Sequence, residues 1–223
     1  MVTPTTAVVP QELTAATGAP TRELVGELRA VVDQAAAHPG GGALVLRVLE
    51  APRTAAHPSD VQEWSRWEKE LIRLERLHVP TVVLLDGEIT GPALHLSLAA
   101  DIRFATPQTV FSVTELAHGY LPGMAIHRLV KQVGLGHARR MVLSGERLTA
   151  PQAERLGLLD SVAADPAQAA ERLLATRSRA LDKPAWHLAR RLLLESHALS
   201  TEDALGSVLA AQERALRERT EQS

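Results

Sequence analysis

Two short aliphatic runs constrain the fold of this chain more than any other feature of its sequence. They read ALVLRVL at residues 43–49 and TVVLL at residues 81–85, and their length and β-branched residues predict buried strands. One helix is predicted before the first run, at 21–37, and another lies between the two runs and ends near Leu77. Strands that alternate with helices in this way form βαβ units with parallel pairing, so we expect an α/β fold.

The remainder of the chain continues with short elements and ends in helices. We expect a helix at 91–99, strands at 101–105 and 109–113, helices at about 122–132, 135–144 and 150–156, and a strand at 158–163. From Pro166 onward the pattern predicts three helices, with no Gly- or Pro-rich linker before them. We therefore divide the chain into a core at 1–165 and a C-terminal helical region at 166–223. The inner face of the last helix is expected to pack on the same body or on a neighbouring subunit; it comprises Leu205, Val208, Leu209, Gln212 and Leu216, of which only Gln212 is polar.

Composition excludes several classes of function. A hydrophobic fraction of 45% and a net charge of −2 over 223 residues indicate a globular chain without the basic surface of a nucleic-acid or membrane-surface binder. The absence of cysteine excludes disulfides, zinc–thiolate sites and thiol nucleophiles. No His, Asp and Glu spacing matches a metal triad, so no metal is expected. With no apolar run of membrane-spanning length and no secretory signal pattern, we expect a cytoplasmic protein.

The stretch DGEITGPALHLSLAADIRFATPQTVFSVTE, residues 86–115, contains the best candidate for a binding turn. Gly87 and Gly91 flank a connection between a strand and a helix, and the free N–H groups of a helix N-terminus suit an oxyanion or a phosphate. A tight connection that needs glycine for steric reasons alone would show the same pattern. Because Pro92 has no N–H, the donors of such a site would have to come from Gly91, Ala93 or Leu94.

Two side chains in the same stretch suit acid–base chemistry. His95 follows the turn and could act as a base or a donor, although a histidine among leucines is also common as a satisfied core residue. Glu115 follows a predicted strand beside apolar residues and suits a general acid or base, with a capping or ion-paired glutamate as the alternative. His118 could lie within reach of Glu115, and Gly123 stands at a predicted helix start that also favours anions.

Residues 80–163 resemble the enoyl-CoA hydratase/isomerase (crotonase) superfamily. The resemblance rests on five segments: 86–93, 100–105, 111–115, 119–125 and 145–159. It implies a ClpP-like spiral of ββα units, trimers or hexamers built through the C-terminal helices, an acyl-CoA thioester as a possible substrate, and no further cofactor. It also implies that His95 occupies the position of one of the two hydratase glutamates, whereas Glu115 retains the other.

Two departures from the family pattern bear on activity. The family's first oxyanion donor lies in a segment that here reads EAPRTAAHPSD, residues 50–60, without glycine, and its second donor matches Pro92. Losing one such donor typically costs about 3–4 kcal/mol of transition-state stabilisation. Hydration by two carboxylates is therefore not expected.

Residues 64–82 and 201–217 resemble more narrowly the short, divergent crotonase homologues of the dihydroxyphenylglycine pathway of glycopeptide antibiotics. That resemblance implies a helper of a type III polyketide synthase, acting on a tetraketide that becomes 3,5-dihydroxyphenylacetyl-CoA. Glu115 and His95 would then serve dehydration and aromatisation as acid and base. The alternatives are a non-catalytic partner or chaperone of the synthase, and a crotonase-fold hydratase or isomerase acting on another thioester.

Overall fold

The computed structural model describes residues 11–15, 19–37, 42–50, 61–181, 184–196 and 200–221. Its centre is a five-stranded sheet in the order β1-β2-β3-β5-β8. These strands are β1 (Gln11–Ala15), β2 (Leu44–Glu50), β3 (Thr81–Leu85), β5 (Ile102–Ala105) and β8 (Ser161–Val162). All neighbouring strands pair in parallel, which confirms the predicted α/β fold.

A second, three-stranded sheet gives the chain a repeating ββα unit. It contains β4 (Glu88–Ile89), β6 (Val110–Phe111) and β7 (Leu148–Thr149), with β4 parallel to β6 and β7 antiparallel to it. After β3 the chain enters this sheet as β4 and then forms α3 (Gly91–Ala99). After β5 it does so as β6, and then forms the 3₁₀ helix η1 (Glu115–His118) and α4 (Ala125–Ser144).

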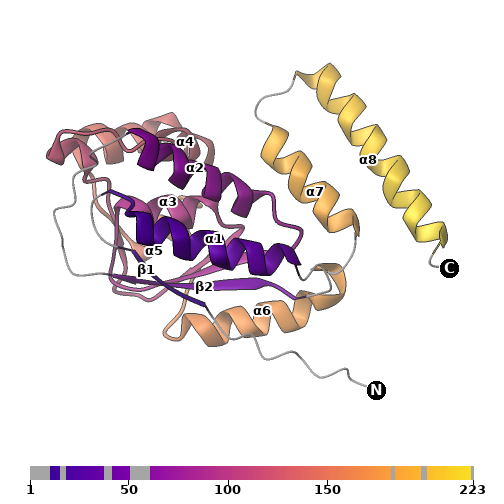
Figure 1. Ribbon diagram of the computed structural model, residues 1–223, viewed down its shortest axis with the longest axis horizontal. Coiled ribbons are helices and arrows are strands. Elements are labelled where there is room, and N and C mark those ends of the chain that lie inside the picture. Colours follow the sequence, from indigo (N-terminus) through magenta and orange to yellow (C-terminus); the bar gives the residue numbers. More distant parts are fainter. Residues whose placement is uncertain are drawn as a thin grey trace.

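Helices cover both faces of the large sheet (Figure 1). On one face, α1 (Arg22–Ala37), α2 (Val61–Glu75), α3 and α5 (Ala150–Arg155) share a core with alternate strand residues such as Leu46, Val83 and Leu85. On the other face, α6 (Pro166–Leu181) packs against Val82 and Leu84. This alternation is the period-2 pattern of strands buried on both sides, and each fully buried aliphatic side chain contributes about 1.5–3 kcal/mol.

The last two helices extend away from the sheet (Figure 1). Helices α7 (Pro184–Glu195) and α8 (Thr201–Glu221) pack against each other. Arg190 anchors α7, because its Nε donates to Asp101 Oδ1 at 2.6 Å and its Nη1 donates to the Leu77 carbonyl at 2.6 Å. The apolar residues of the α8 face that was predicted to pack inward are between 45% and 59% exposed in the single chain; they are Leu205, Val208, Leu209 and Leu216. The division at residue 165 stays a prediction.

Several element boundaries differ from those predicted. β1 was not predicted, and the strand expected at 109–113 is only Val110–Phe111. The two helices predicted at 122–132 and 135–144 form one run, α4, interrupted at Gly134, where φ 74° and ψ 162° lie outside the helical region. Glycine tolerates this conformation because it has no Cβ. Glu115, expected at a strand end, instead begins η1.

Candidate active site

His95 and Glu115 lie in direct contact. His95 Nε2 is 3.3 Å from Glu115 Oε1, and both side chains are fully buried. The second carboxylate oxygen of Glu115 accepts the Thr114 N–H at 2.9 Å. A 2.8 Å hydrogen bond between the hydroxyls of Thr90 and Thr114 ties the start of α3 to the start of η1. These hydrogen bonds connect the elements that carry the two members of the pair.

The turn at the start of α3 offers fewer donors than a complete oxyanion site. Gly91 has φ +52°, a left-handed value that favours glycine, and Pro92 follows it in the first helical turn. The Leu94 N–H already donates to the Thr90 carbonyl at 3.4 Å. Of the three donors predicted from the sequence, Leu94 is therefore engaged, which leaves Gly91 and Ala93 as the candidates.

The other two residues predicted for the site, His118 and Gly123, do not contact the His95–Glu115 pair in the same way. His118 is exposed, and its Nδ1 lies 2.8 Å from the Thr114 carbonyl, so it stands beside Glu115 in the chain rather than in contact with the buried pair. Gly123 has φ +49°, and a Cβ there would lie 3.5 Å from the Trp64 ring and 3.6 Å from Glu68 Oε1. Gly123 therefore borders the site through α2, against two residues that were not predicted.

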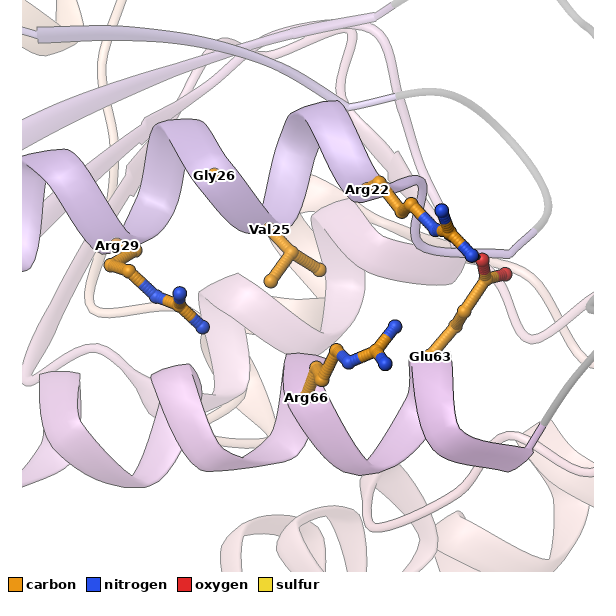
Figure 2. Close-up of a pocket in the computed structure, with 6 residues that line it drawn as sticks. All are labelled: Arg22, Val25, Gly26, Arg29, Glu63 and Arg66. Atoms are coloured by element: carbon orange, nitrogen blue, oxygen red, sulfur yellow. Dashed lines mark hydrogen bonds and ion pairs between the residues drawn. The ribbon is translucent and has the colours of Figure 1, made fainter.

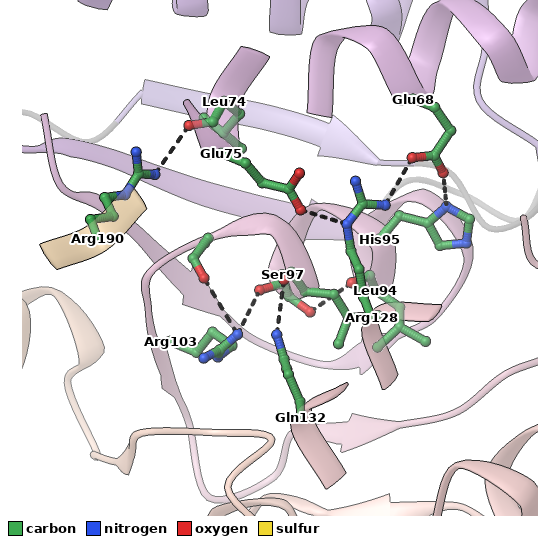
Figure 3. Close-up of polar contacts among 12 residues, drawn as sticks. Glu68, Leu74, Glu75, Leu94, His95, Ser97, Arg103, Arg128, Gln132 and Arg190 are labelled. Atoms are coloured by element: carbon green, nitrogen blue, oxygen red, sulfur yellow. Dashed lines mark hydrogen bonds and ion pairs between the residues drawn. The ribbon is translucent and has the colours of Figure 1, made fainter. Parts of the chain in front are cut away.

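Glu68 and Arg128 extend the buried cluster (Figure 3). Glu68 Oε1 lies 3.9 Å from His95 Nδ1, and Glu68 Oε2 accepts from Arg128 Nη1 at 2.8 Å. Arg128 also donates from Nε to Glu75 Oε1 at 2.7 Å. The sequence held one signal for Glu68: it stands one helical turn after Trp64, and residues four apart share a face of a helix.

A series of rings connects the buried pair to the surface. The ring centroid of Trp64 is 5.4 Å from that of His95 and 6.2 Å from that of Tyr120, and Tyr120 is 6.3 Å from His118. Burial raises the pKa of the Tyr120 hydroxyl, and the Glu115 carboxylate raises it further. Both effects favour a neutral phenol.

A separate surface pocket lies between α1 and α2 (Figure 2). Its volume is about 170 Å³, and its lining includes Arg22, Arg29, Arg66 and Glu63. Arg22 pairs with Glu63 at 3.3 Å, and Arg29 pairs with Glu70 at 2.9 Å. None of the residues predicted for the site lines this pocket, and its carboxylate partners offset part of its positive charge.

Three further expectations from the sequence concern a metal site, a membrane span and the segment at 50–60, and the structure describes only part of the residues involved. Within that part, no group of three or more His, Asp or Glu side chains is arranged to hold a metal ion. None of the described helices has the length and apolarity needed to cross a membrane. The segment at 50–60 stands in place of the family's first oxyanion donor, and all of it after Glu50 lies outside the described residues.

Comparisons with known proteins identify the family of this chain and its fold. The sequence profile of the enoyl-CoA hydratase/isomerase family matches residues 50–223. A protein of Amycolatopsis orientalis named enoyl-CoA-hydratase is 37% identical over 194 residues, which cover 86% of this chain and 89% of the relative. An enoyl-CoA hydratase/isomerase family protein from Silicibacter pomeroyi superposes with a TM-score of 0.75 at 18% identity, covering 94% of this chain and 97% of that one. The enoyl-CoA hydratase from Bacillus anthracis gives 0.72 at 20% identity, with 90% and 86% covered. The two structures show a shared fold.

Proposed function

Because the chain belongs to the enoyl-CoA hydratase/isomerase family, we propose that it is an acid–base catalyst in which Glu115 and His95 exchange one proton. The observation that carries the proposal is the 3.3 Å contact between His95 Nε2 and Glu115 Oε1 in a site sealed from solvent. A hydratase with two carboxylates would need a second acidic side chain where this chain has His95. An imidazole and a carboxylate in contact instead suit a reaction that takes up one proton and delivers another.

The reaction that fits this pair is the loss of water from a β-hydroxy carbonyl compound. Neutral His95 takes the proton from the α-carbon, and protonated Glu115 donates its proton to the departing hydroxyl. The carbon–oxygen bond breaks, a carbon–carbon double bond forms, and water leaves. His95 then carries two protons and Glu115 carries none, so transfer from Nε2 to Oε1 across the 3.3 Å contact restores the starting state. No external acid or base is consumed.

The proposed substrate is a cyclised tetraketide, made from malonyl-CoA by a type III polyketide synthase and held as a thioester or released from it. Loss of water then aromatises the ring toward 3,5-dihydroxyphenylacetyl-CoA. The support is the resemblance of residues 64–82 and 201–217 to helpers of that pathway. The gain in aromatic stabilisation lowers the demand for oxyanion donors. A turn that contains Pro92 and has only the N–H groups of Gly91 and Ala93 as donors is therefore sufficient.

The test is product profiling of the partner synthase with malonyl-CoA, in the presence of wild-type protein or the Glu115→Gln variant. We expect wild type to raise the dihydroxyphenylacetyl product and Glu115→Gln to lower this effect about 100-fold or more, the size of a general acid–base contribution. Glu146→Gln is the control, since it removes a partly exposed carboxylate paired with Arg140 far along the chain. An equal rise with wild type and Glu115→Gln contradicts the catalytic proposal.

One observation favours a second candidate function. His95 and Glu115 are both fully buried, and Pro92 removes a donor at the turn, which is the pattern of a disused site in a non-catalytic partner of the synthase. Under that reading, Glu115→Gln keeps the helper effect, whereas changes at exposed apolar residues such as Leu121 and Met124 abolish it. A hydratase or isomerase acting on another thioester is tested by crotonyl-CoA hydration, for which we expect little turnover.

The exposed apolar face of α8 supports a homotrimer or a hexamer of stacked trimers. Leu205 and Leu209 are each 59% exposed in the single chain, and burial of such a face against a second copy is favourable. Leu209→Glu is expected to lower the molar mass measured by light scattering to that of one chain. A wild-type protein that elutes as a monomer would contradict the assembly.

A further inference from the structure

We infer that Glu68 is a positioning residue that keeps one proton on Nδ1 of His95. Nε2 of the same ring is then left to exchange a second proton with Oε1 of Glu115. The inference rests on the proposed function for its catalytic meaning, but its geometric part stands independently. Among the described residues, the Glu68 carboxylate accepts its hydrogen bond from Arg128 of α4. Glu68 approaches the Nδ1 atom of His95 (Figure 3), whereas Glu115 contacts the Nε2 atom of the same ring.

Two buried atoms without partners point at each other. His95 Nδ1 and Glu68 Oε1 are both sealed from solvent, and neither has a hydrogen-bond partner among the described residues. They lie 3.9 Å apart. A buried polar atom without a partner costs about 1–3 kcal/mol, so a resting state that leaves both atoms unpaired is unfavourable. A shift of about 1 Å joins them in a direct hydrogen bond.

The polarity of that hydrogen bond is fixed by Arg128. A guanidinium carries only donors, so Glu68 Oε2, which receives Arg128 Nη1 at 2.8 Å, is an acceptor. The ion pair with Arg128 requires an ionised Glu68 carboxylate, and the other oxygen of an ionised carboxylate, Oε1, is also an acceptor. Only an Nδ1 that carries a hydrogen can pair with it. The proton on Nδ1 leaves Nε2 to share the other proton with Glu115 Oε1.

The charges around the ring favour the same arrangement. Glu68, Glu75 and Glu115 bring three carboxylates to a cluster in which Arg128 is the guanidinium that contacts two of them. When His95 has taken up the α-proton, the imidazolium lies between Glu68 on its Nδ1 side and Glu115 on its Nε2 side. Carboxylates on both nitrogens stabilise this charged intermediate, as the orienting acid does in a Ser–His–Asp triad.

The substitution Glu68→Gln should reverse the tautomer rather than merely weaken the contact. Arg128 still requires an acceptor, so the amide oxygen of the glutamine turns toward the guanidinium and its NH₂ group turns toward His95. Nδ1 then meets a donor, and the resting ring carries its proton on Nε2. Glu75→Gln is the matched control, because it removes a carboxylate from the same guanidinium but does not face His95.

The experiment records long-range ¹H–¹⁵N spectra of histidine-labelled resting protein, with His95 assigned by the signals missing in His95→Gln. We expect a proton on Nδ1 in wild type and in Glu75→Gln, and on Nε2 in Glu68→Gln. Wild-type spectra without a proton on Nδ1 overturn the inference even if Glu68→Gln does not fold. An unchanged tautomer in folded Glu68→Gln overturns it as well.

Helper assays of the same variants separate this inference from the proposed function. A reversed tautomer accompanied by about 100-fold loss of helper activity supports both, because a ring protonated on Nε2 cannot take the α-proton there. A reversed tautomer with full activity supports the positioning role of Glu68 and overturns the catalytic use of His95. Recovery of the wild-type tautomer by Glu68→Asp, which restores a carboxylate, would support the role of the carboxylate itself.

Discussion

Helix α2 carries two glutamates two residues apart, one buried and one partly buried, and their carboxylates differ in how they are paired. Glu70 is only 4% exposed, and both of its oxygens are paired: Oε1 accepts from Arg29 Nε at 2.9 Å and Oε2 accepts from Arg73 Nη1 at 2.7 Å. Glu68 pairs one oxygen with Arg128, and its other oxygen faces His95 without a hydrogen bond. The two lie on different sides of the same helix.

The difference separates a structural carboxylate from one available for chemistry. Buried polar groups in folded proteins are nearly always paired, so a carboxylate with a full set of partners needs no further explanation. An unpaired atom that faces an imidazole indicates a site where local stability has been given up. Glu70 thus serves to join α1 to α2, whereas Glu68 belongs with His95 and Glu115.

The largest loss in the free energy of unfolding is expected from Arg128→Met, which removes the cation that pairs with Glu68 and Glu75. It leaves the carboxylates of Glu68 and Glu75 without their shared cation, although their side chains are only 14% and 20% exposed. Breaking a buried pair in this way costs about 3 kcal/mol. Urea unfolding followed by circular dichroism measures the loss. Arg140→Met, at the more exposed Arg140–Glu146 pair, should cost under about 0.5 kcal/mol, and equal losses at both positions would contradict this account.

Glu70→Gln sharpens the comparison from the structural side. Its partners Arg29 and Arg73 are 54% and 43% exposed, so solvent screens the pairs and the free energy of unfolding should fall by only about 1 kcal/mol. Helper activity should stay at the wild-type level at temperatures where the variant is folded. If Glu70→Gln instead lost activity to the same extent as Glu68→Gln, the separation between the two glutamates would be wrong.

The smallest effect concerns Tyr120, the one tyrosine of the sequence. Its pKa is raised by burial and, to a lesser extent, by the Glu115 carboxylate. Glu115→Gln should therefore lower that pKa part of the way toward its ordinary value, whereas Glu70→Gln should leave it unchanged. Ultraviolet absorbance during an alkaline titration reports the change directly.

The same shift predicts a dependence of stability on pH. The neutral phenol is favoured in the folded chain, so its contribution to stability is complete below the unfolded pKa of about 10 and is lost as pH rises through the raised folded pKa. Tyr120→Phe should remove this part of the alkaline loss in urea unfolding. An unchanged alkaline loss in Tyr120→Phe would show that other groups cause it.

The sequence predicted the centre of the fold well and its edges poorly. The strand at 81–85 and the helix at 91–99 were recognisable because all of their residues are buried, and the strand at 43–49 because Leu44, Val45, Leu46 and Val48 are. β1 escaped prediction because its sequence, QELTA, contains little aliphatic character, and it lies at the edge of the sheet. The sequence predicted two separate helices on either side of Gly134, whereas the structure has one run, α4, that is interrupted at this residue.

The site was predictable in its members but not in its geometry. His95 and Glu115 were chosen from the residues and from the family pattern, yet their contact depends on how η1 folds back against α3, which no spacing reveals. Glu68 was missed because a charged residue on an amphipathic helix ordinarily faces solvent. Only its pairing with Arg128, 60 residues later, shows that this carboxylate is held inside.

The most direct test of the account is a double-mutant cycle at the buried pair. Glu115→Gln, His95→Gln and the double variant are compared in the helper assay with the synthase and malonyl-CoA. If the two residues exchange one proton across their 3.3 Å contact, the double variant should lose no more activity than the more damaging single variant. Losses that multiply would show that the two side chains act independently, and unchanged activity in all three variants would show that the pair has no catalytic role.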